Sequence, residues 1–171
     1  MIFKYLFLNI FFLLNLSIGI CQIIQITPAF PTVNDIITLQ YDASQGNGGL
    51  IGISPVYTHT GIVTQNGLPS SWSYVQGSWG QADSNVLMSD LGNNIHEIII
   101  DIDQYYGFPS GTDVKKLAFV FRNSDGSLEG KTATMGDIFY PIYPVNGGFQ
   151  AAIIKPYTDL LVDMGDTFSF E

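Results

Sequence analysis

Residues 116–122 read Lys-Leu-Ala-Phe-Val-Phe-Arg, and residues 123–126 continue as Asn-Ser-Asp-Gly. In the first segment Leu117, Phe119 and Phe121 alternate with small or charged residues, which is the period of a strand with one buried face. The second segment has the composition of a tight hairpin turn. Together they predict an antiparallel β structure in this part of the chain.

Short β-rich runs separated by Gly, Pro, Asn, Asp and Ser clusters extend this pattern over residues 22–143. Ile37, Leu39 and Tyr41 alternate with polar residues, which again predicts one buried face. About eight such runs with turns between them are typical of a β-sandwich, so we expect an all-β antiparallel fold. The other predicted strands are residues 23–27, 50–58 with Pro55 at an edge or bulge, 72–75, 86–91, 96–102 and 137–143. Residues 45–49 (QGNGG) read as a loop, and residues 103–106 as one helical turn.

Charge and composition exclude some classes of partner. The 171 residues carry six Lys plus Arg against fifteen Asp plus Glu, a net charge of −9, and only 12% are charged. A uniformly acidic chain has no basic face for phosphate, which disfavours nucleic acid. Docking on an anionic membrane by charge is disfavoured for the same reason. The single cysteine, Cys21, rules out an internal disulfide and a multi-cysteine zinc site.

Residues 1–21 (MIFKYLFLNIFFLLNLSIGIC) account for much of the mean hydropathy of +0.24. Lys4, a short apolar run and a small-residue end are the plan of a secretory signal peptide, so we predict a secreted or cell-surface protein. The run is short for a spanning helix, and no transmembrane helix is expected after cleavage. Two alternatives are an uncleaved anchor and a lipoprotein acylated at Cys21.

The C-terminal part, residues 144–171, is predicted to hold a linker and the start of a second β domain. Asn146, Gly147 and Gly148 read as the linker, and the sequence stops within a strand-like run, residues 167–171. This predicts a fragment whose next domain lies beyond Glu171. The alternative is a short tail that packs back on the sandwich.

Catalytic and metal motifs are scarce, and we predict no cofactor. Asp101 and Asp103 alternate, so they could form a carboxylate pair for glycoside hydrolysis. Solubilising residues on the wet face of a strand are the stronger interpretation of that pair. Asp125-Gly126 faintly resembles a calcium loop but lacks its full spacing, so a plain turn is favoured and structural calcium stays an alternative.

The informative stretch is residues 56–80 (VYTHTGIVTQNGLPSSWSYVQGSWG), which contains both tryptophans of the chain. Alternation places Tyr57 and His59 on one strand face, and it places Trp72 and Tyr74 on one face of another. Aromatic residues in a polar, turn-rich region have two interpretations. They either pack in the core, or they stack on the flat C–H face of a sugar ring while neighbouring polar groups bind its hydroxyls. Trp79 belongs to the same candidate set.

Five segments in order carry a family resemblance: residues 30–42, 43–49, 56–61 (VYTHTG), 72–80 (WSYVQGSWG) and 117–126. This run resembles the N-terminal β-sandwich module of secreted alpha-amylase-type proteins of the Bacteroidetes. Those modules are similar to starch-binding carbohydrate-binding modules of families twenty-five and twenty-six. The resemblance covers residues 23–143, and VYTHTG followed by Trp72 is its most specific part.

The resemblance implies an immunoglobulin-like sandwich with a non-catalytic site for neutral α-glucan, starch or glycogen. Tyr57 and His59 match the strand positions of that site, and Trp72 matches the aromatic platform that follows. The implied role is to tether a downstream catalytic domain to polysaccharide, so polysaccharide degradation is expected of that domain. The alternatives are a structural or adhesion domain without a sugar site, with both tryptophans buried, and a catalytic module in its own right.

Overall fold

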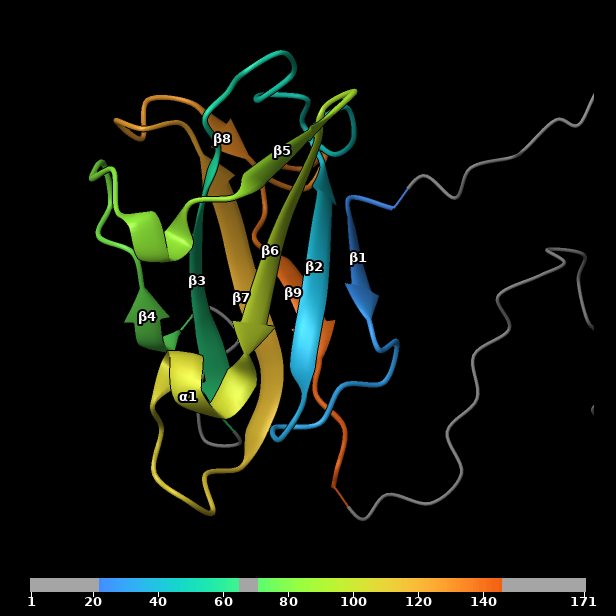
Figure 1. Ribbon diagram of the computed structural model, residues 1–171, viewed down its shortest axis with the longest axis vertical. Helices are drawn as coiled ribbons and strands as arrows, with labels where there is room; N and C mark the ends of the chain where they lie inside the picture. The colour runs from blue at the N-terminus through green and yellow to red at the C-terminus, as the bar shows by residue number, and fades with distance from the viewer. Residues whose placement is uncertain (1–21, 65–70, 146–171) are drawn as a thin grey trace, which may run out of the picture.

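The structure is a computed structural model, and it describes residues 22–64 and 71–145. The predicted signal peptide and most of the predicted linker and second domain therefore lie outside the described residues. Within them the chain forms nine strands and two short helices (Figure 1). The strands are β1 (Ile24–Thr27), β2 (Ile36–Asp42), β3 (Tyr57–Thr64), β4 (Ser73–Gln76), β5 (Ser89–Gly92), β6 (Ile95–Asp101), β7 (Val114–Arg122), β8 (Glu129–Gly130) and β9 (Ile138–Pro141). The helices are the 3-10 turn η1 (Ser84–Val86) and α1 (Ile102–Tyr106).

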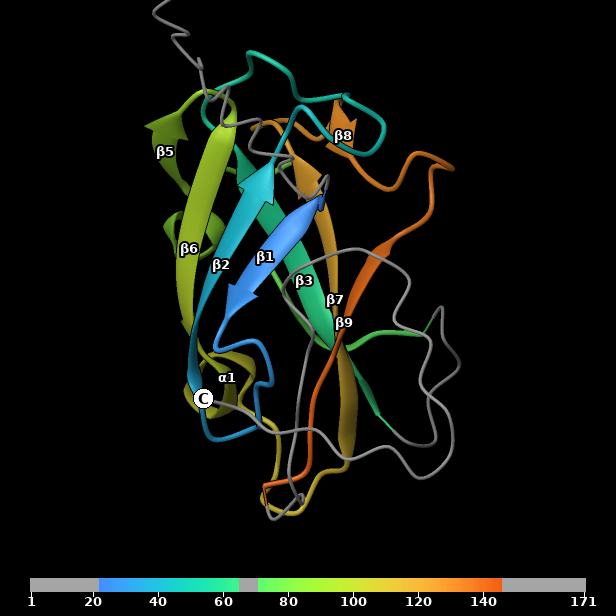
Figure 2. The same cartoon turned by 90° about the vertical axis from the view of Figure 1, so that its right-hand side faces the viewer.

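The strands make two antiparallel sheets that pack face to face, which confirms the predicted all-β sandwich. The first sheet has the order β1-β2-β6-β5. The second has the order β4-β3-β7, and both β8 and β9 pair with the other edge of β7. Figure 2 shows the two layers, with β6, β2 and β1 on one side and β3, β7 and β9 on the other.

This strand order is that of the immunoglobulin fold. The sheet β1-β2-β6-β5 faces a second sheet in which β3 and β7 are central and β4, β8 and β9 lie at the edges. A parallel bridge between Thr32 and Tyr143 adds a contact between the segment after β1 and the segment after β9. This bridge joins two segments that are far apart in the sequence.

The core lies between the sheets and is filled by the inward faces that alternation predicted. Ile37, Leu39 and Tyr41 of β2 are fully buried, and so are Leu117 and Phe119 of β7. Phe121 of β7 stacks on Tyr41 across the interface, with ring centroids 3.8 Å apart and planes 13° from parallel. Burying large apolar side chains on both sheets supplies the main stabilising free energy of such a fold.

Two details differ from the sequence expectations. The strand predicted over residues 50–58 begins only at Tyr57, and the preceding residues form turns that include Pro55, which has no N–H for a ladder. Asp101 and Asp103 do not share a strand face, because β6 ends at Asp101 and α1 begins at Ile102. The carboxylate of Asp101 instead caps α1 by accepting a hydrogen bond from the Gln104 N–H at 3.3 Å.

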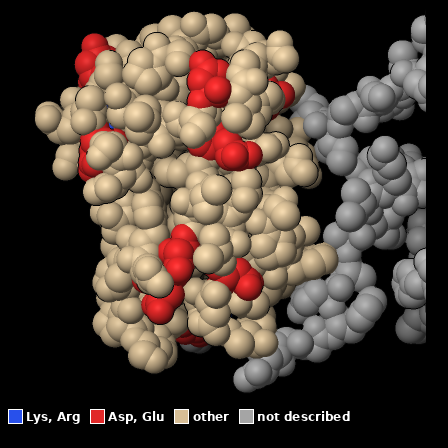
Figure 3. All heavy atoms as spheres, viewed as in Figure 1, with Lys and Arg blue, Asp and Glu red and all other residues tan. Residues whose placement is uncertain are grey.

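The outer face of the first sheet carries scattered acidic side chains rather than one charged patch (Figure 3). Here Gln40 of β2 donates to Glu97 of β6 at 2.8 Å, and Ile99 stands 64% exposed between polar neighbours. In the part of the chain that the structure describes, no helix is long and apolar enough to cross a membrane.

Candidate functional site

The outer face of the second sheet carries the candidate site, and the strand register defines its rows. Thr58, Thr60 and Ile62 of β3 pair with the inward residues of β7. Tyr57 and His59 therefore share one face, as alternation predicted, and the structure shows that this is the outer face. Across β3, β7 and the strands beyond, the outward residues form four rows. The rows are Tyr57–Arg122–Glu129, His59–Val120, Gly61–Ala118–Phe139 and Val63–Lys116–Pro141.

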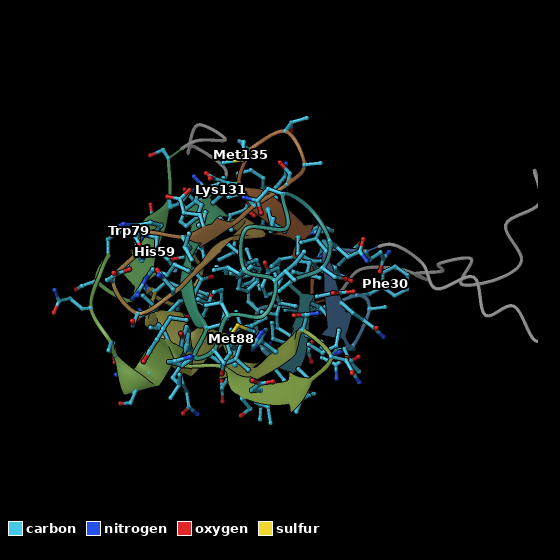
Figure 4. All side chains as sticks on the ribbon, turned by 90° about the horizontal axis from the view of Figure 1, so that it is seen from above. Phe30, His59, Trp79, Met88, Lys131 and Met135 are labelled. Atoms are coloured by element: carbon cyan, nitrogen blue, oxygen red, sulfur yellow. The ribbon has the colours of Figure 1, made fainter. Side chains whose placement is uncertain are left out.

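An open cleft of about 470 Å³ lies over the second of these rows. His59 and Val120 form its floor. One side, the aromatic wall, consists of Trp72, Val75 and Trp79. The other side, the polar wall, consists of Glu129, Lys131 and Asp137. Figure 4 shows His59, Trp79 and Lys131 on one side of the sandwich and Phe30 at the opposite edge.

His59 is held in one orientation at the centre of the cleft. Its Nδ1 lies 2.7 Å from the carbonyl oxygen of Gly77. Because a carbonyl can only accept, Nδ1 carries a hydrogen and donates it to Gly77. The imidazole contacts both indoles, with ring centroids 5.8 Å from Trp72 and 5.3 Å from Trp79.

The two indoles of the aromatic wall are inclined to each other. Trp72 lies 33° from the imidazole plane and Trp79 lies 89° from it, so their own planes differ by at least 56°, the difference of the two angles. Trp79 is 43% exposed, whereas Trp72 is half-buried. The wall therefore offers two aromatic surfaces at a steep angle rather than one flat platform.

Arg122 holds the segment that carries Trp79. The residue is fully buried, and its guanidinium lies 5.2 Å from the Tyr57 ring centroid and 6.0 Å from that of Trp79. Nη2 donates to the carbonyl oxygens of Ser78 at 3.0 Å and Gln81 at 2.6 Å. Burial lowers the pKa of Arg122 from its usual value, and nearby Tyr57 and Asp83 oppose that shift. The guanidinium remains charged, because even a lowered arginine pKa stays far above neutrality.

The same guanidinium also holds the hairpin turn that follows β7. Nη1 donates to the carbonyl oxygens of Asn123 at 3.0 Å and Ser124 at 3.3 Å. Gly126 in this turn lies against the indole, since a Cβ added there would be 2.6 Å from Nε1 of Trp79. Arg122 therefore joins the segment that carries Trp79 to the hairpin turn after β7, through two main-chain oxygens of each.

The polar wall is held by the 45–49 loop. Nδ2 of Asn47 donates to the Glu129 carbonyl oxygen at 2.9 Å, and Oδ1 accepts from the Lys131 N–H at 3.1 Å. The Asn47 N–H donates to the Lys131 carbonyl oxygen at 3.0 Å. Gly46 and Gly49 permit this approach, because a Cβ at either would overlap a carbonyl oxygen of Lys131 or Glu129. Asn47 thus pairs with the backbone of the β8 segment as a neighbouring strand would.

The side chains of the polar wall form an ion pair that faces the cleft. Nζ of Lys131 lies 2.8 Å from Oε2 of Glu129, and both side chains are mostly covered, with 21% and 31% of their surface exposed. Asp137, the residue before β9, also lines the cleft. A donor and two acceptor groups of this kind can bind hydroxyl groups on one edge of a ligand.

Of the five residues predicted for the site, the structure brings His59, Trp72 and Trp79 together in the cleft. Tyr57 lies on the same face but is covered by Arg122 and is 7% exposed. Tyr74 lies elsewhere, with its ring 6.3 Å from that of Phe108. The expectation that Trp72 and Tyr74 share a face is wrong. An irregularity in the β3–β4 pairing and a positive φ of 52° at Tyr74 interrupt the alternation.

Sequence reasoning missed the polar wall, Arg122 and Asn47. Glu129, Lys131 and Asp137 come from segments beyond the predicted hairpin, with no motif to mark them. One signal was available for Arg122, which lies in phase with the outward residues Ala118 and Val120 of β7, because a charged residue at the end of an apolar strand needs hydrogen-bond partners. A second signal was the glycine-rich loop around Asn47, residues 45–49 (QGNGG), because glycines allow another backbone segment to come close.

Asp125, the candidate calcium residue, serves the turn. Its Oδ1 accepts hydrogen bonds from the Ser127 hydroxyl at 2.6 Å and the Ser127 N–H at 3.0 Å. These bonds, the hydroxyl first, lower the pKa of Asp125. Within residues 22–64 and 71–145 no three or more His, Cys, Asp or Glu side chains gather as metal ligands would.

No curated protein matches this chain. A family model described as Domain of unknown function (DUF8578) matches residues 24–129, from the start of β1 to the start of β8. The matched segment contains the cleft floor, the aromatic wall and Glu129, whereas Lys131 and Asp137 lie beyond it. Because the match spans more than half of the sequence, the chain belongs to the family described as Domain of unknown function (DUF8578).

Proposed function

We propose that this protein is a non-catalytic module that binds neutral α-glucan, such as starch or glycogen, in the cleft on its second sheet. The observation that carries the proposal is the aromatic wall, in which Trp72 and Trp79 are inclined by at least 56°, the difference between their 33° and 89° tilts from His59. A flat polysaccharide surface requires coplanar rings. Two inclined rings instead fit a chain that turns from one sugar to the next, as an α-1,4-linked chain does.

The polar wall supports the same proposal. A sugar ring stacked on an indole directs its hydroxyl groups sideways, and the Glu129–Lys131 ion pair and Asp137 lie across the cleft. The ion pair supplies a donor and an acceptor side by side, which suits two neighbouring hydroxyls. Two carboxylates against one ammonium disfavour anionic sugars, so the wall favours a neutral ligand.

The proposed mechanism is binding without turnover. Each contact is partly open to water, so the net free energy of one site is small. Useful avidity then comes from linkage to a second site or to a catalytic domain on the same polysaccharide. In keeping with the family resemblance, we place the module in an exported or cell-surface protein of the amylase type, where it would tether the enzyme to its substrate.

Affinity electrophoresis of the purified chain in gels containing amylose or glycogen tests the proposal. We expect retardation that Trp79→Ala and Trp72→Ala each reduce about tenfold or more in apparent affinity, the loss of roughly 1.4 kcal/mol of stacking. Tyr74→Ala is the matched control, since it removes an exposed aromatic residue outside the cleft, and its migration should be unchanged.

Intrinsic fluorescence gives a second readout, because the two tryptophans of the chain both line the cleft. We expect soluble α-glucan to protect them from acrylamide quenching. The structural or adhesion alternative expected both indoles to be buried, which the 43% exposure of Trp79 does not support. Migration that is the same for the original chain and both Trp variants would overturn the α-glucan proposal and favour that alternative.

A further inference from the structure

Tyr41 of β2 reaches across the core to the backbone of the polar wall. Gly130 is the residue between Glu129 and Lys131, whose side chains form the ion pair of that wall. A Cβ added at Gly130 would overlap Oη of Tyr41 and would lie 2.8 Å from its Cζ. The phenol end of Tyr41 therefore fills the space beside Gly130 on the core side, and the main chain of the polar wall packs against it.

The ring of Tyr41 is fixed by its neighbours. Tyr41 is fully buried and stacks on Phe121 of β7, with ring centroids 3.8 Å apart. His96, its cross-strand partner on β6, also stacks on it, with centroids 6.3 Å apart and planes 27° from parallel. In a close-packed core a ring held in this way cannot swing aside. Because Phe121 also pairs with Gly130 in the ladder between β7 and β8, the position of the Tyr41 hydroxyl relative to Gly130 is set.

The hydroxyl of Tyr41 is buried and has no hydrogen-bond partner among the described residues. A buried polar group without a partner lowers the free energy of unfolding. Phenylalanine would keep the ring contacts without that cost. Tyr106 shows the usual arrangement, because its buried hydroxyl lies 2.7 Å from the Thr60 hydroxyl. The Tyr41 hydroxyl is therefore explained better by what it contacts than by a contribution to stability.

From this arrangement we infer that Tyr41 is a positioning residue for α-glucan binding, because its hydroxyl keeps the Glu129–Lys131 ion pair in the position that faces the cleft. The inference rests on the proposed function, since it assigns a core residue to the same site. Asn47 holds the main chain of the polar wall by hydrogen bonds, whereas Tyr41 supports it from the core by contact. The wall depends on such supports because β8 is only two residues long.

Tyr41→Phe tests the inference, because it removes the hydroxyl and keeps the ring. We expect the affinity of the purified chain for glycogen, measured by affinity electrophoresis, to fall about three- to tenfold, because the polar wall can then move toward the core. The midpoint of chemical denaturation should stay the same or rise, since no hydrogen bond within the protein is lost. A purely structural role of Tyr41 would not separate affinity from stability in this way.

Tyr106→Phe is the matched control. It removes a buried hydroxyl that has a partner and does not line the cleft, so it should lower the denaturation midpoint and leave the affinity unchanged. Gly130→Ala probes the same contact from the other side, because its Cβ would overlap the Tyr41 hydroxyl. Gly130→Ala should lower the affinity more in the original chain than in the Tyr41→Phe variant.

A double-mutant cycle with Lys131→Ala shows whether Tyr41 acts through the ion pair. Tyr41→Phe should reduce the affinity by less than about twofold in the Lys131→Ala variant, because the ammonium that it positions is gone. The positioning role alone would be overturned by unchanged affinity in Tyr41→Phe or by additive losses in the cycle. It would also be overturned if Tyr41→Phe lowered the denaturation midpoint as much as Tyr106→Phe does. Absence of glycogen binding by the original chain would overturn the proposed function and this role with it.

Discussion

The two walls of the cleft carry different kinds of side chain, but each is held in the same way, by one polar side chain that binds its main chain. The aromatic wall comes from the residue before β4, from β4 and from the loop after it, and Arg122 binds the main-chain oxygens of Ser78 and Gln81 on either side of Trp79 in the sequence. The polar wall comes from β8 and the residues after it, and Asn47 binds the main chain of Glu129 and Lys131. In each case one polar side chain holds a segment that has little regular structure of its own.

The two supporting residues differ in the free energy that their burial costs. Arg122 is a charged group with no surface exposure, and its burial depends on the four hydrogen bonds of Nη1 and Nη2, because its Nε has no hydrogen-bond partner among the described residues. Asn47 is neutral and half-buried, and its loop is already shaped by glycines. Substitution of Arg122 should therefore disturb the aromatic wall strongly, whereas substitution of Asn47 should disturb the polar wall weakly. Four substitutions test this contrast.

The largest effect is expected for Arg122→Met, which leaves four main-chain oxygens without their donor. We expect the free energy of unfolding to fall by about 2–4 kcal/mol, as for other buried polar networks that lose one member. Trp79 should become more accessible to acrylamide, because both segments around it are released. Chemical denaturation and fluorescence quenching measure the two effects.

Arg122→Lys provides the control for charge. Lysine keeps the positive charge but cannot reach four acceptors in a planar fork. If Arg122→Lys matches the original chain in both stability and quenching, charge alone supports the wall and the role given to the fork is wrong.

The next effect is expected for Gly126→Ala. Gly126 has a φ of 71°, and a Cβ there would overlap the Trp79 indole. Strain at a positive φ costs about 1 kcal/mol, and the contact displaces the ring further. We expect a moderate loss of stability and a change in Trp emission. Gly107→Ala is a matched control, since its φ is 63° and nothing lies within 4 Å of the added Cβ. Equal emission spectra for the two variants would contradict the placement of Trp79.

A smaller effect is expected for Asn47→Ala, which removes one donor and one acceptor from the polar wall. The loss should be about 1–2 kcal/mol in the free energy of unfolding, the usual value for such hydrogen bonds. Acrylamide quenching of the two tryptophans should not change, because the aromatic wall has its own support. A quenching change as large as that of Arg122→Met would show that the walls are not held independently.

The smallest effect is expected for Lys131→Gln, which removes the partner of Glu129 but keeps a hydrogen-bond donor. Ion pairs with partial exposure contribute about 0–1 kcal/mol, so thermal unfolding should shift little. Affinity for α-glucan should fall more than stability does, since the ammonium faces the cleft. Glycogen binding and thermal unfolding of the same sample separate the two, and a fall in stability without a fall in affinity would remove Lys131 from the ligand contacts.

Sequence alternation predicted the sandwich because burial on one face repeats every two residues in β2 and β7. It also placed Tyr57 and His59 on one face, and the aromatic, turn-rich stretch of residues 56–80 marked Trp72 and Trp79, which the structure brings into the cleft. The same rule failed at Tyr74, where a positive φ and an irregular pairing turn the side chain away. The polar wall was not predictable, because Asn47 and Lys131 are 84 positions apart in the sequence and meet only through the loop geometry.

The bonds of Arg122 and Asn47 end largely on main-chain atoms, and this has a consequence for how such proteins diversify. A carbonyl oxygen or an amide is present whatever side chain the residue carries. The residues that face the ligand can therefore be exchanged while each wall keeps its support. Homologues that retain the arginine at the end of β7 and the glycine-rich loop are expected to share the shape of the cleft, even where they have acquired preferences for different sugars.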